Sequence, residues 1–117
     1  MDEFTRAYIH AAAFTDDPSP EPGEYPEPDH ADLNPDFVAE AVADCAQFQA
    51  YGNARRWIAG NEAKAGRDFW YTRQHHGCGF WDGDWPGAVE DKLDSLAKTF
   101  SETYTDVFQF VESEDTP

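Results

Sequence analysis

Lysine and arginine are scarce in this chain of 117 residues. Eight of them stand against 24 aspartate and glutamate residues, so the formal net charge is −16. Binding to nucleic acid depends on Lys and Arg that neutralise phosphates, so this balance argues against direct nucleic-acid binding. The charge is uneven: residues 1–50 carry −11, residues 51–76 carry +3 and residues 77–117 carry −8. Such a field favours association with a positively charged surface, although acidity can also serve solubility alone.

Cysteine and long hydrophobic runs are also rare. Cys45 and Cys78 are the two cysteines, and they are too few and too far apart for a disulfide framework or a zinc knuckle, so we expect reduced thiols. The chain opens with Met1-Asp2-Glu3, and no apolar run approaches the length of a signal-peptide core or a membrane span. We therefore expect a cytoplasmic protein without a membrane partner.

Aromatic residues are plentiful, at 15% of the chain, whereas Leu and Ile are few. We therefore expect an aromatic-rich core. The length suits one domain over residues 1–117 and is too short for two independent cores.

Helical spacing marks the first half of the chain. Apolar residues predict a short helix over residues 2–14, while repeated Pro and acidic residues predict an exposed loop over about 15–33. Asn34 followed by Pro35 is typical of a helix start. That helix should run to about residue 51 with Cys45 on its apolar stripe, and a weaker helix should follow over 53–65.

Residues 67–74 and 79–82 are rich in aromatic residues and Thr, with a possible turn between them, which predicts a β-hairpin. An amphipathic helix should follow from Pro86 to about Glu102, then a final strand over 104–112 and a frayed tail at 113–117. The expected fold is α+β, with a small antiparallel sheet of the hairpin and the C-terminal strand packed against three to four helices.

The densest motif is D-F-W-Y-T-R-Q-H-H-G-C-G-F-W-D, which starts at residue 68. Together with F-T-R-A-Y-I-H-A-A near the N-terminus and L-A-K-T-F near residue 100, it resembles a family of small acidic proteins carried by bacteriophages and other mobile elements. The signature residues are Asp68, Phe69, Trp70, Thr72, Arg73, His76, Gly77, Gly79, Phe80, Trp81 and Asp82. His75 departs from the family pattern, and so does the C-terminus, where relatives tend to carry a second short hairpin.

The resemblance implies a protein that acts inside a bacterial host cell. Small acidic proteins of this origin often inhibit restriction, CRISPR or other nucleic-acid enzymes by occupying a DNA- or RNA-binding groove, so an activity of this DNA-mimic type is the expectation by analogy.

Two interpretations of the signature stay open. Asp68, His76 and Asp82 could form a carboxylate and imidazole cluster for a small metal-assisted enzyme. Their spacing fits no standard metal motif, so the other interpretation gives the signature a structural role, with Arg73 paired to Asp82 or Asp84 and the tryptophans in the core. We expect no cofactor.

The binding hypothesis instead needs carboxylates on an exposed face, which a basic, nucleic-acid-binding host protein would recognise. The candidate partner-binding residues are Glu21, Glu24, Glu27, Asp29, Asp84, Glu90, Asp91 and Asp94. Glu90 and Asp94 are four residues apart on one helix face and repel each other without a cationic partner. A third possibility is an assembly protein that forms a homodimer through exposed aromatics such as Trp85.

Overall fold

Helices form the regular secondary structure of residues 1–16, 33–75, 79–80 and 85–108, which are the residues that this computed structural model describes. An isolated antiparallel bridge pairs Leu33 with Phe108. The helices of the described residues are α1 (Glu3–Asp16), α2 (Pro35–Ala50), α3 (Ala54–Ile58), α4 (Glu62–Arg73) and α5 (Gly87–Lys98). Within this part of the chain, no helix has the length and apolar character needed to cross a membrane.

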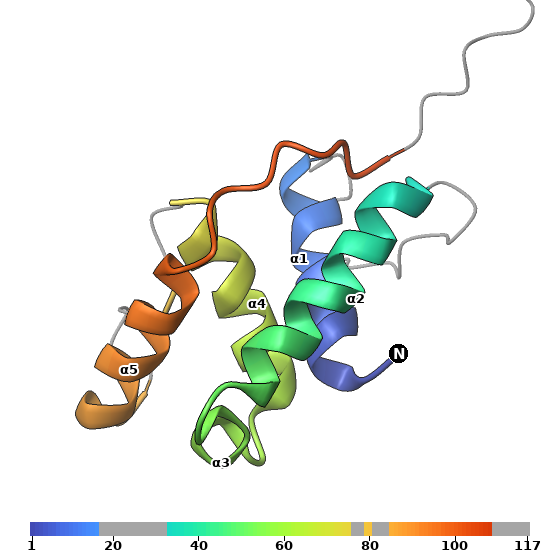
Figure 1. Ribbon diagram of the computed structural model, residues 1–117. Coiled ribbons are helices and arrows are strands. Elements are labelled where there is room, and N and C mark those ends of the chain that lie inside the picture. The colour runs from blue at the N-terminus through green and yellow to red at the C-terminus, as the bar shows by residue number, and fades with distance from the viewer. Residues whose placement is uncertain (17–32, 76–78, 81–84, 109–117) are drawn as a thin grey trace, which may run out of the picture.

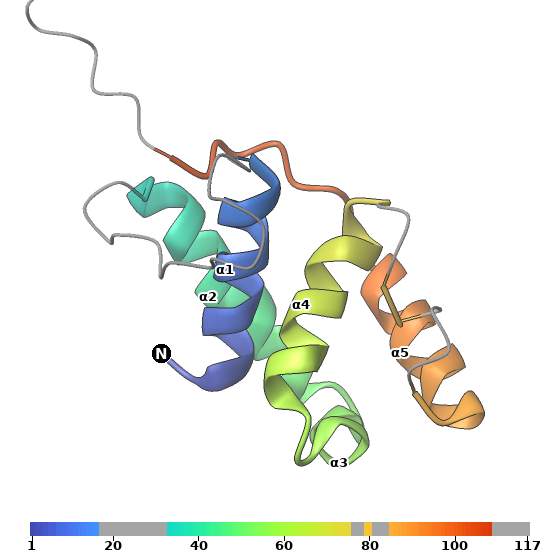
Figure 2. The same ribbon diagram turned by 180° about the vertical axis from the view of Figure 1, so that it is seen from behind.

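The longer helices are arranged around α4. It packs most extensively on α1 and also contacts α5 on its other side, while α2 contacts α1 and α3. Figure 1 and the reverse view in Figure 2 show α4 between α1 and α5, with α2 crossing one face. In Figure 1, the short α3 lies at the end of the molecule opposite residues 101–108.

Gly66 permits the close approach of α1 and α4. A Cβ atom built at this position would overlap the Phe4 carbonyl oxygen and lie 3.2 Å from the Tyr8 nitrogen. Because only hydrogen fits there, the two helix backbones can meet almost without intervening side chains. This contact brings Phe4 and Tyr8 onto the aromatic residues of α4.

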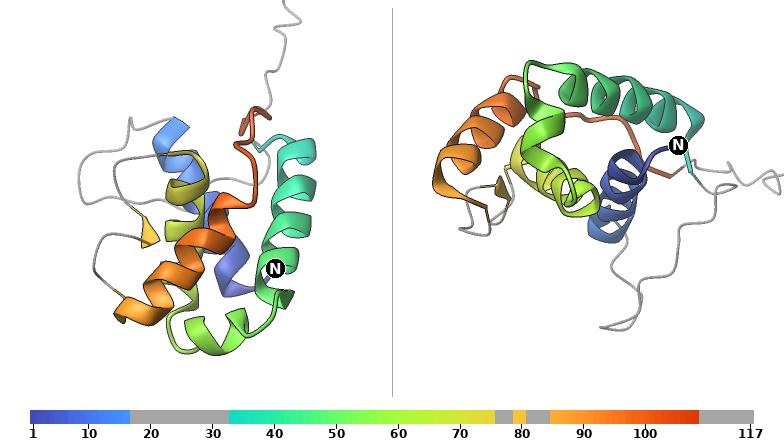
Figure 3. Two further views of the ribbon diagram at one scale, coloured as in Figure 1. Left: turned by 60° about the vertical axis from the view of Figure 1, so that its left-hand side comes forward. Right: turned by 90° about the horizontal axis from the view of Figure 1, so that it is seen from below.

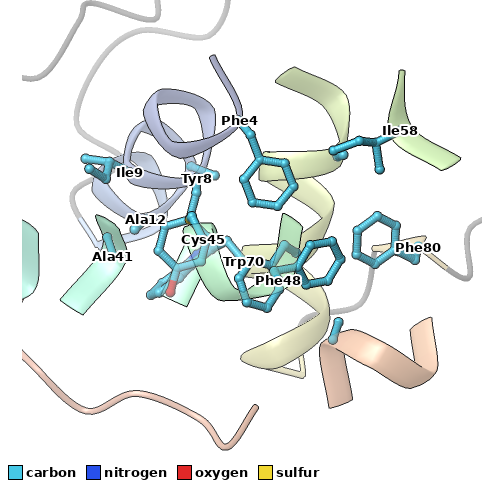
Figure 4. Packing of buried hydrophobic residues seen from close by; sticks show 14 of the residues in the cluster. Phe4, Tyr8, Ile9, Ala12, Ala41, Cys45, Phe48, Ile58, Trp70 and Phe80 are labelled. Atoms are coloured by element: carbon cyan, nitrogen blue, oxygen red, sulfur yellow. The ribbon is translucent and has the colours of Figure 1, made fainter. Parts of the chain in front are cut away.

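Aromatic rings fill the core, as the composition predicts. The Phe48 ring lies 4.5 Å from that of Phe69 and 5.3 Å from that of Phe4, measured between centroids. The Phe80 ring stacks on the other side of Phe48 at 5.8 Å. Figure 4 shows Phe4, Tyr8, Phe48, Trp70 and Phe80 gathered between the helices. Rings from α1, α2, α4 and the segment before α5 therefore share a single core.

The predicted β-hairpin is wrong, because residues 67–73 belong to α4. Phe69 and Trp70 are adjacent, and both are buried in the same core. In a strand they would point to opposite faces, but in a helix they are about 100° apart and can share one broad apolar side. With Ala65 and Thr72, they form a helical stripe, so packing outweighs the β preference of the aromatic residues and Thr.

The C-terminal segment does not join a sheet either. The described residues 101–108 run along α2 and α4 without regular structure, apart from the bridge of Phe108 to Leu33. Residues 109–112 of the predicted strand, and the predicted tail, lie outside the described residues. The helix predicted to reach Glu102 ends at Lys98. The α+β prediction is therefore corrected to a mostly helical fold.

Other sequence predictions are confirmed. The Asn34 side chain caps α2 by accepting a hydrogen bond from the Asp36 nitrogen at 3.0 Å, and Cys45 is fully buried. The helix predicted to run to about residue 51 ends at Ala50, where Gly52 follows with a positive φ of 48°. The single helix predicted over 53–65, however, is wrong, because Gly60, with a φ of 83°, separates α3 from α4. The predicted loop over 15–33 falls mainly on residues 17–32, which are not described.

Candidate functional site

Arg73 is the polar centre of the signature. Its side chain is 5% exposed, and its Nη1 donates to Asp44 Oδ2 at 2.9 Å and to the Tyr8 hydroxyl at 3.0 Å. Its Nε and Nη2 donate to the Ser101 carbonyl at 3.0 and 2.8 Å. One guanidinium therefore links α4 to α1, to α2 and to the segment that follows α5, using the fork of donors that only arginine has.

Aromatic rings enclose the same guanidinium. Its central carbon lies 5.6 Å from the ring centres of Phe69 and Phe100. Burial disfavours the charged form, but the neighbouring Tyr8 and the Asp44 carboxylate outweigh this effect and raise the pKa of Arg73. Burial also raises the pKa of the Tyr8 phenol, which keeps it a neutral hydroxyl. The arrangement keeps the Arg73 guanidinium charged and fixed beside Asp44. Its predicted partners, Asp82 and Asp84, lie outside the described residues.

Thr72 and Gly79 form a second structural contact of the signature. The Thr72 hydroxyl accepts a hydrogen bond from the Phe80 nitrogen at 3.0 Å. Gly79 has a φ of 148°, and a Cβ atom there would overlap that hydroxyl. The signature glycine thus lets the chain pass close to α4 and deliver Phe80 to the core.

Asp68 contacts Trp85, the aromatic residue that the assembly hypothesis expects to be exposed. Its Oδ2 accepts a hydrogen bond from Trp85 Nε1 at 2.8 Å, and the Lys64 ammonium lies 4.6 Å from the Trp85 ring centre. Trp85 is 6% exposed and belongs to the core, so it cannot provide the exposed surface of the assembly hypothesis. The Asp68 carboxylate instead fixes Trp85 between α4 and α5.

The metal-assisted hypothesis has no assembled cluster in the described part of the chain. His76 and Asp82 lie outside it, as do Gly77 and Trp81. Among the residues that are described, no group of three or more His, Cys, Asp or Glu side chains could hold a metal ion. The described signature residues are instead engaged in packing, hydrogen bonds and the Arg73 ion pair.

The predicted partner-binding acids divide into two groups. Glu90, Asp91 and Asp94 are on α5, whereas Glu21, Glu24, Glu27, Asp29 and Asp84 lie outside the described residues. Asp94 Oδ2 pairs with the Lys98 ammonium at 2.8 Å, and the Asp94 side chain is only 19% exposed. The expected repulsion with Glu90 is thereby offset by a cation that the sequence reasoning did not consider. Asp91 is exposed on the same helix.

Sequence reasoning missed the residues that hold the C-terminal segment. Gln74 Nε2 donates to the Thr103 carbonyl at 3.0 Å, and its Oε1 accepts from the Thr103 nitrogen at 2.8 Å. The Glu40 carboxylate accepts from the hydroxyls of Thr103 and Thr105. A polar hollow of about 700 Å³ lies between α2 and residues 99–105. The alternating Thr103 and Thr105 were a usable signal, but the strand prediction over 104–112 rested on Phe108 and Phe110 and gave the threonines no role.

Comparisons with known proteins add no assignment. No protein-family model, curated protein or solved structure matches this chain.

Proposed function

We propose that this protein binds a basic surface of a nucleic-acid-binding host protein and thereby blocks its access to nucleic acid. Carboxylates replace phosphates in this role, because both present negative oxygens to Arg and Lys side chains. The proposal combines the charge of −16 with the resemblance to phage and mobile-element proteins.

The main supporting observation is the position of the two most acidic stretches. Residues 17–32 hold six acids and residues 109–117 hold three, and neither stretch contains a Lys or Arg. The described residues next to them meet: Leu33 bridges Phe108, and the Asn34 nitrogen donates to the Val107 carbonyl at 2.8 Å. Both acidic stretches are therefore attached at one end of the fold.

Described acids lie at that end as well. Asp36 in the first turn of α2 and Asp106 are exposed, and Glu40 is partly exposed one turn further along α2. Asn34 Nδ2 donates to the Asp106 carbonyl at 2.9 Å and so keeps Asp106 next to the α2 start. Figure 1 shows residues 101–108 reaching the start of α2, across the molecule from α5. We call this region the acidic end.

A salt-dependent capture experiment tests the proposal. The tagged protein would be used as bait in nuclease-treated bacterial lysate at about 0.1 M and about 0.5 M salt, where screening of exposed charges differs strongly. We expect a basic, nucleic-acid-binding protein that is retained at low salt and released at high salt, and whose binding to added nucleic acid the bait inhibits. A bait that retains no such protein at either salt concentration would refute the proposal.

A charge-matched pair of variants localises the interaction. Glu24→Gln combined with Glu27→Gln removes two charges from the acidic stretch of residues 17–32, whereas Glu3→Gln combined with Glu62→Gln removes two from the starts of α1 and α4. We expect the first variant to bind the captured protein several-fold more weakly, mainly through slower association. Equal affinities of the two variants would place the binding surface elsewhere.

A further inference from the structure

Tyr51 stands apart from the buried aromatic residues, because its side chain is 61% exposed. Its backbone is nevertheless held on both sides: its nitrogen donates to the Phe48 carbonyl at 3.3 Å, and its carbonyl accepts from the Ala54 nitrogen at 2.9 Å. The ring is thus presented to solvent from an anchored position, which lowers the entropy cost of using it as a contact.

Tyr51 borders a groove of about 530 Å³ between the end of α2, α3 and α5. The residues that line the groove are Tyr51, Trp57, Asp91, Lys92, Ser95, Leu96 and Thr99. The right-hand view of Figure 3 shows α3 between the end of α2 and α5. We call this feature the Tyr51 groove.

The groove already contains one aromatic–cation contact. The Lys92 ammonium lies 5.4 Å from the centre of the Trp57 ring, which shows that this ring offers its negative face to a cation. Lys92 is an exposed lysine on a flexible stem, so an incoming cation can displace it. A guanidinium is planar and less strongly hydrated than an ammonium, and it stacks better on aromatic rings.

Asp91 supplies the matching carboxylate. Its side chain is exposed, and within the described part of the chain it forms no ion pair, in contrast to Asp94, which Lys98 neutralises at 2.8 Å. The groove thus combines two aromatic rings with a carboxylate that is open to a new partner. These are the groups that recognise a guanidinium by stacking and by charge-assisted hydrogen bonds.

We infer that the Tyr51 groove receives an arginine side chain of the basic partner, which stacks on Tyr51 or Trp57 and pairs with Asp91. This inference rests on the proposed function. The 16 residues of α2 span about 24 Å between the acidic end and the groove. One standard interface patch, roughly 800 Å² on each partner, is large enough to include both.

The first test uses a short oligoarginine peptide and NMR of the isotope-labelled protein. We expect the signals of Tyr51 and the Trp57 indole to shift on titration. Asp91→Asn should weaken the response at these signals by about threefold, and Lys92→Ala should strengthen it by about twofold, because a competing cation leaves the ring. The altered side chains are exposed, and circular dichroism would verify that the variants fold.

Matched controls separate the groove from general charge attraction. Glu3→Gln removes an exposed carboxylate at the start of α1, and Arg55→Ala removes an exposed cation of α3 that does not line the groove. Each should change the response at the groove signals less than its counterpart does. The opposite signs, with Asp91→Asn strengthening and Lys92→Ala weakening the response, would identify an anionic occupant and overturn the inference. Groove signals that do not shift would also overturn it.

The captured host protein then distinguishes this inference from the proposed function. We expect Tyr51→Ala, which removes a 61% exposed ring, to lower its affinity several-fold, whereas Tyr51→Phe, which keeps the ring that stacks on a guanidinium, should bind about as tightly as the wild-type chain. If the wild-type chain shows salt-dependent capture but Tyr51→Ala and Asp91→Asn bind as tightly, the groove inference fails and the proposed function stands. If the wild-type chain captures no basic protein, the proposed function itself fails.

Discussion

Arg73 Nη1 lies 2.9 Å from Asp44 Oδ2, an ion pair that joins α4 to α2 in the interior of the molecule. The two residues are 29 positions apart, and Arg73 additionally holds Tyr8 and the Ser101 carbonyl. The signature arginine therefore connects three helices and the C-terminal segment. This gives the arginine of the signature a structural role.

Replacing Arg73 should destabilise the protein strongly. Arg73→Met leaves Asp44, Tyr8 and the Ser101 carbonyl without their donor, and loss of one partner of a buried pair costs about 3 kcal/mol. Urea unfolding followed by circular dichroism would measure this loss. Arg67→Met is the matched control on the exposed side of α4 and should change the free energy of unfolding by less than about 0.5 kcal/mol. Similar values for both variants would contradict the role of Arg73.

The contact between α1 and α4 should not tolerate a side chain at Gly66. In Gly66→Ala the added methyl group overlaps the Phe4 carbonyl, and the forced separation of the helices should cost about 2 kcal/mol or more. Gly87→Ala is the control, because a Cβ atom there meets nothing within 4 Å, and it should be neutral or slightly stabilising. Thermal unfolding of the two variants checks both expectations, and a stabilised Gly66→Ala protein would disprove the close approach.

The start of α1 should respond to acid. Asp2 Oδ1 accepts from the Thr5 nitrogen at 2.8 Å, as a capping carboxylate does, and Oδ2 accepts from Gln49 Nε2 at 3.1 Å. Burial opposes ionisation of Asp2, but the hydrogen bonds from Thr5 and Gln49 lower its pKa below 3.8. Because the pKa is lower in the folded state, the contribution is complete above about pH 4 and is lost as the pH falls through the folded pKa.

Asp2→Ala therefore should cost about 1 kcal/mol at neutral pH, and the difference from the wild-type protein should shrink at pH 2–3. Unfolding curves recorded across this pH range measure the effect. The control Glu3→Ala changes the adjacent exposed carboxylate and should show a smaller difference. A cost of Asp2→Ala that grows as the pH falls would contradict the sign of the pKa shift.

Removal of the Gln74 amide should loosen the C-terminal segment. Gln74 makes both a donor and an acceptor contact to the backbone of Thr103, so Gln74→Ala leaves a sheltered amide without its partner. We expect a loss of about 1 kcal/mol and faster hydrogen exchange at Thr103 than at the amides of α4. Gln47→Ala, an exposed glutamine of α2, provides the control. Unchanged exchange at Thr103 would refute this role.

The sequence predicted local features well where one residue decides the geometry. The cap by Asn34 and the end of α2 near Gly52 both appear in the structure, whereas Gly60 divides the single helix predicted over 53–65 into α3 and α4. The error at residues 67–73 has a different origin, because aromatic residues and Thr favour strands only when neighbouring strands receive them. Here Gly66 lets α1 pack closely against this segment. Phe69 and Trp70 are therefore buried on a helical face instead of in a sheet.

The candidate sites divide in the same way. The excess of acids over bases could be counted directly, and it supports a binding function regardless of the fold. The structural role of each signature residue could not be predicted from the sequence. The partners of Arg73, for example, are 29 and 65 positions away from it. The groove beside Tyr51 was equally hidden, since its walls come from α2, α3 and α5.

By itself, the sequence determined the charge of the protein, its aromatic core and the helix boundaries marked by Asn34 and Gly52. These properties depend on composition or on the backbone preference of single residues, so no distant contact is needed to set them. Tertiary structure alone decided that residues 68–73 of the signature are helical, that Arg73 pairs with Asp44, and that Lys98 neutralises Asp94 whereas Asp91 forms no ion pair among the described residues. Each of these outcomes depends on groups brought together by packing, whose free energy exceeds the small local preferences that the sequence displays.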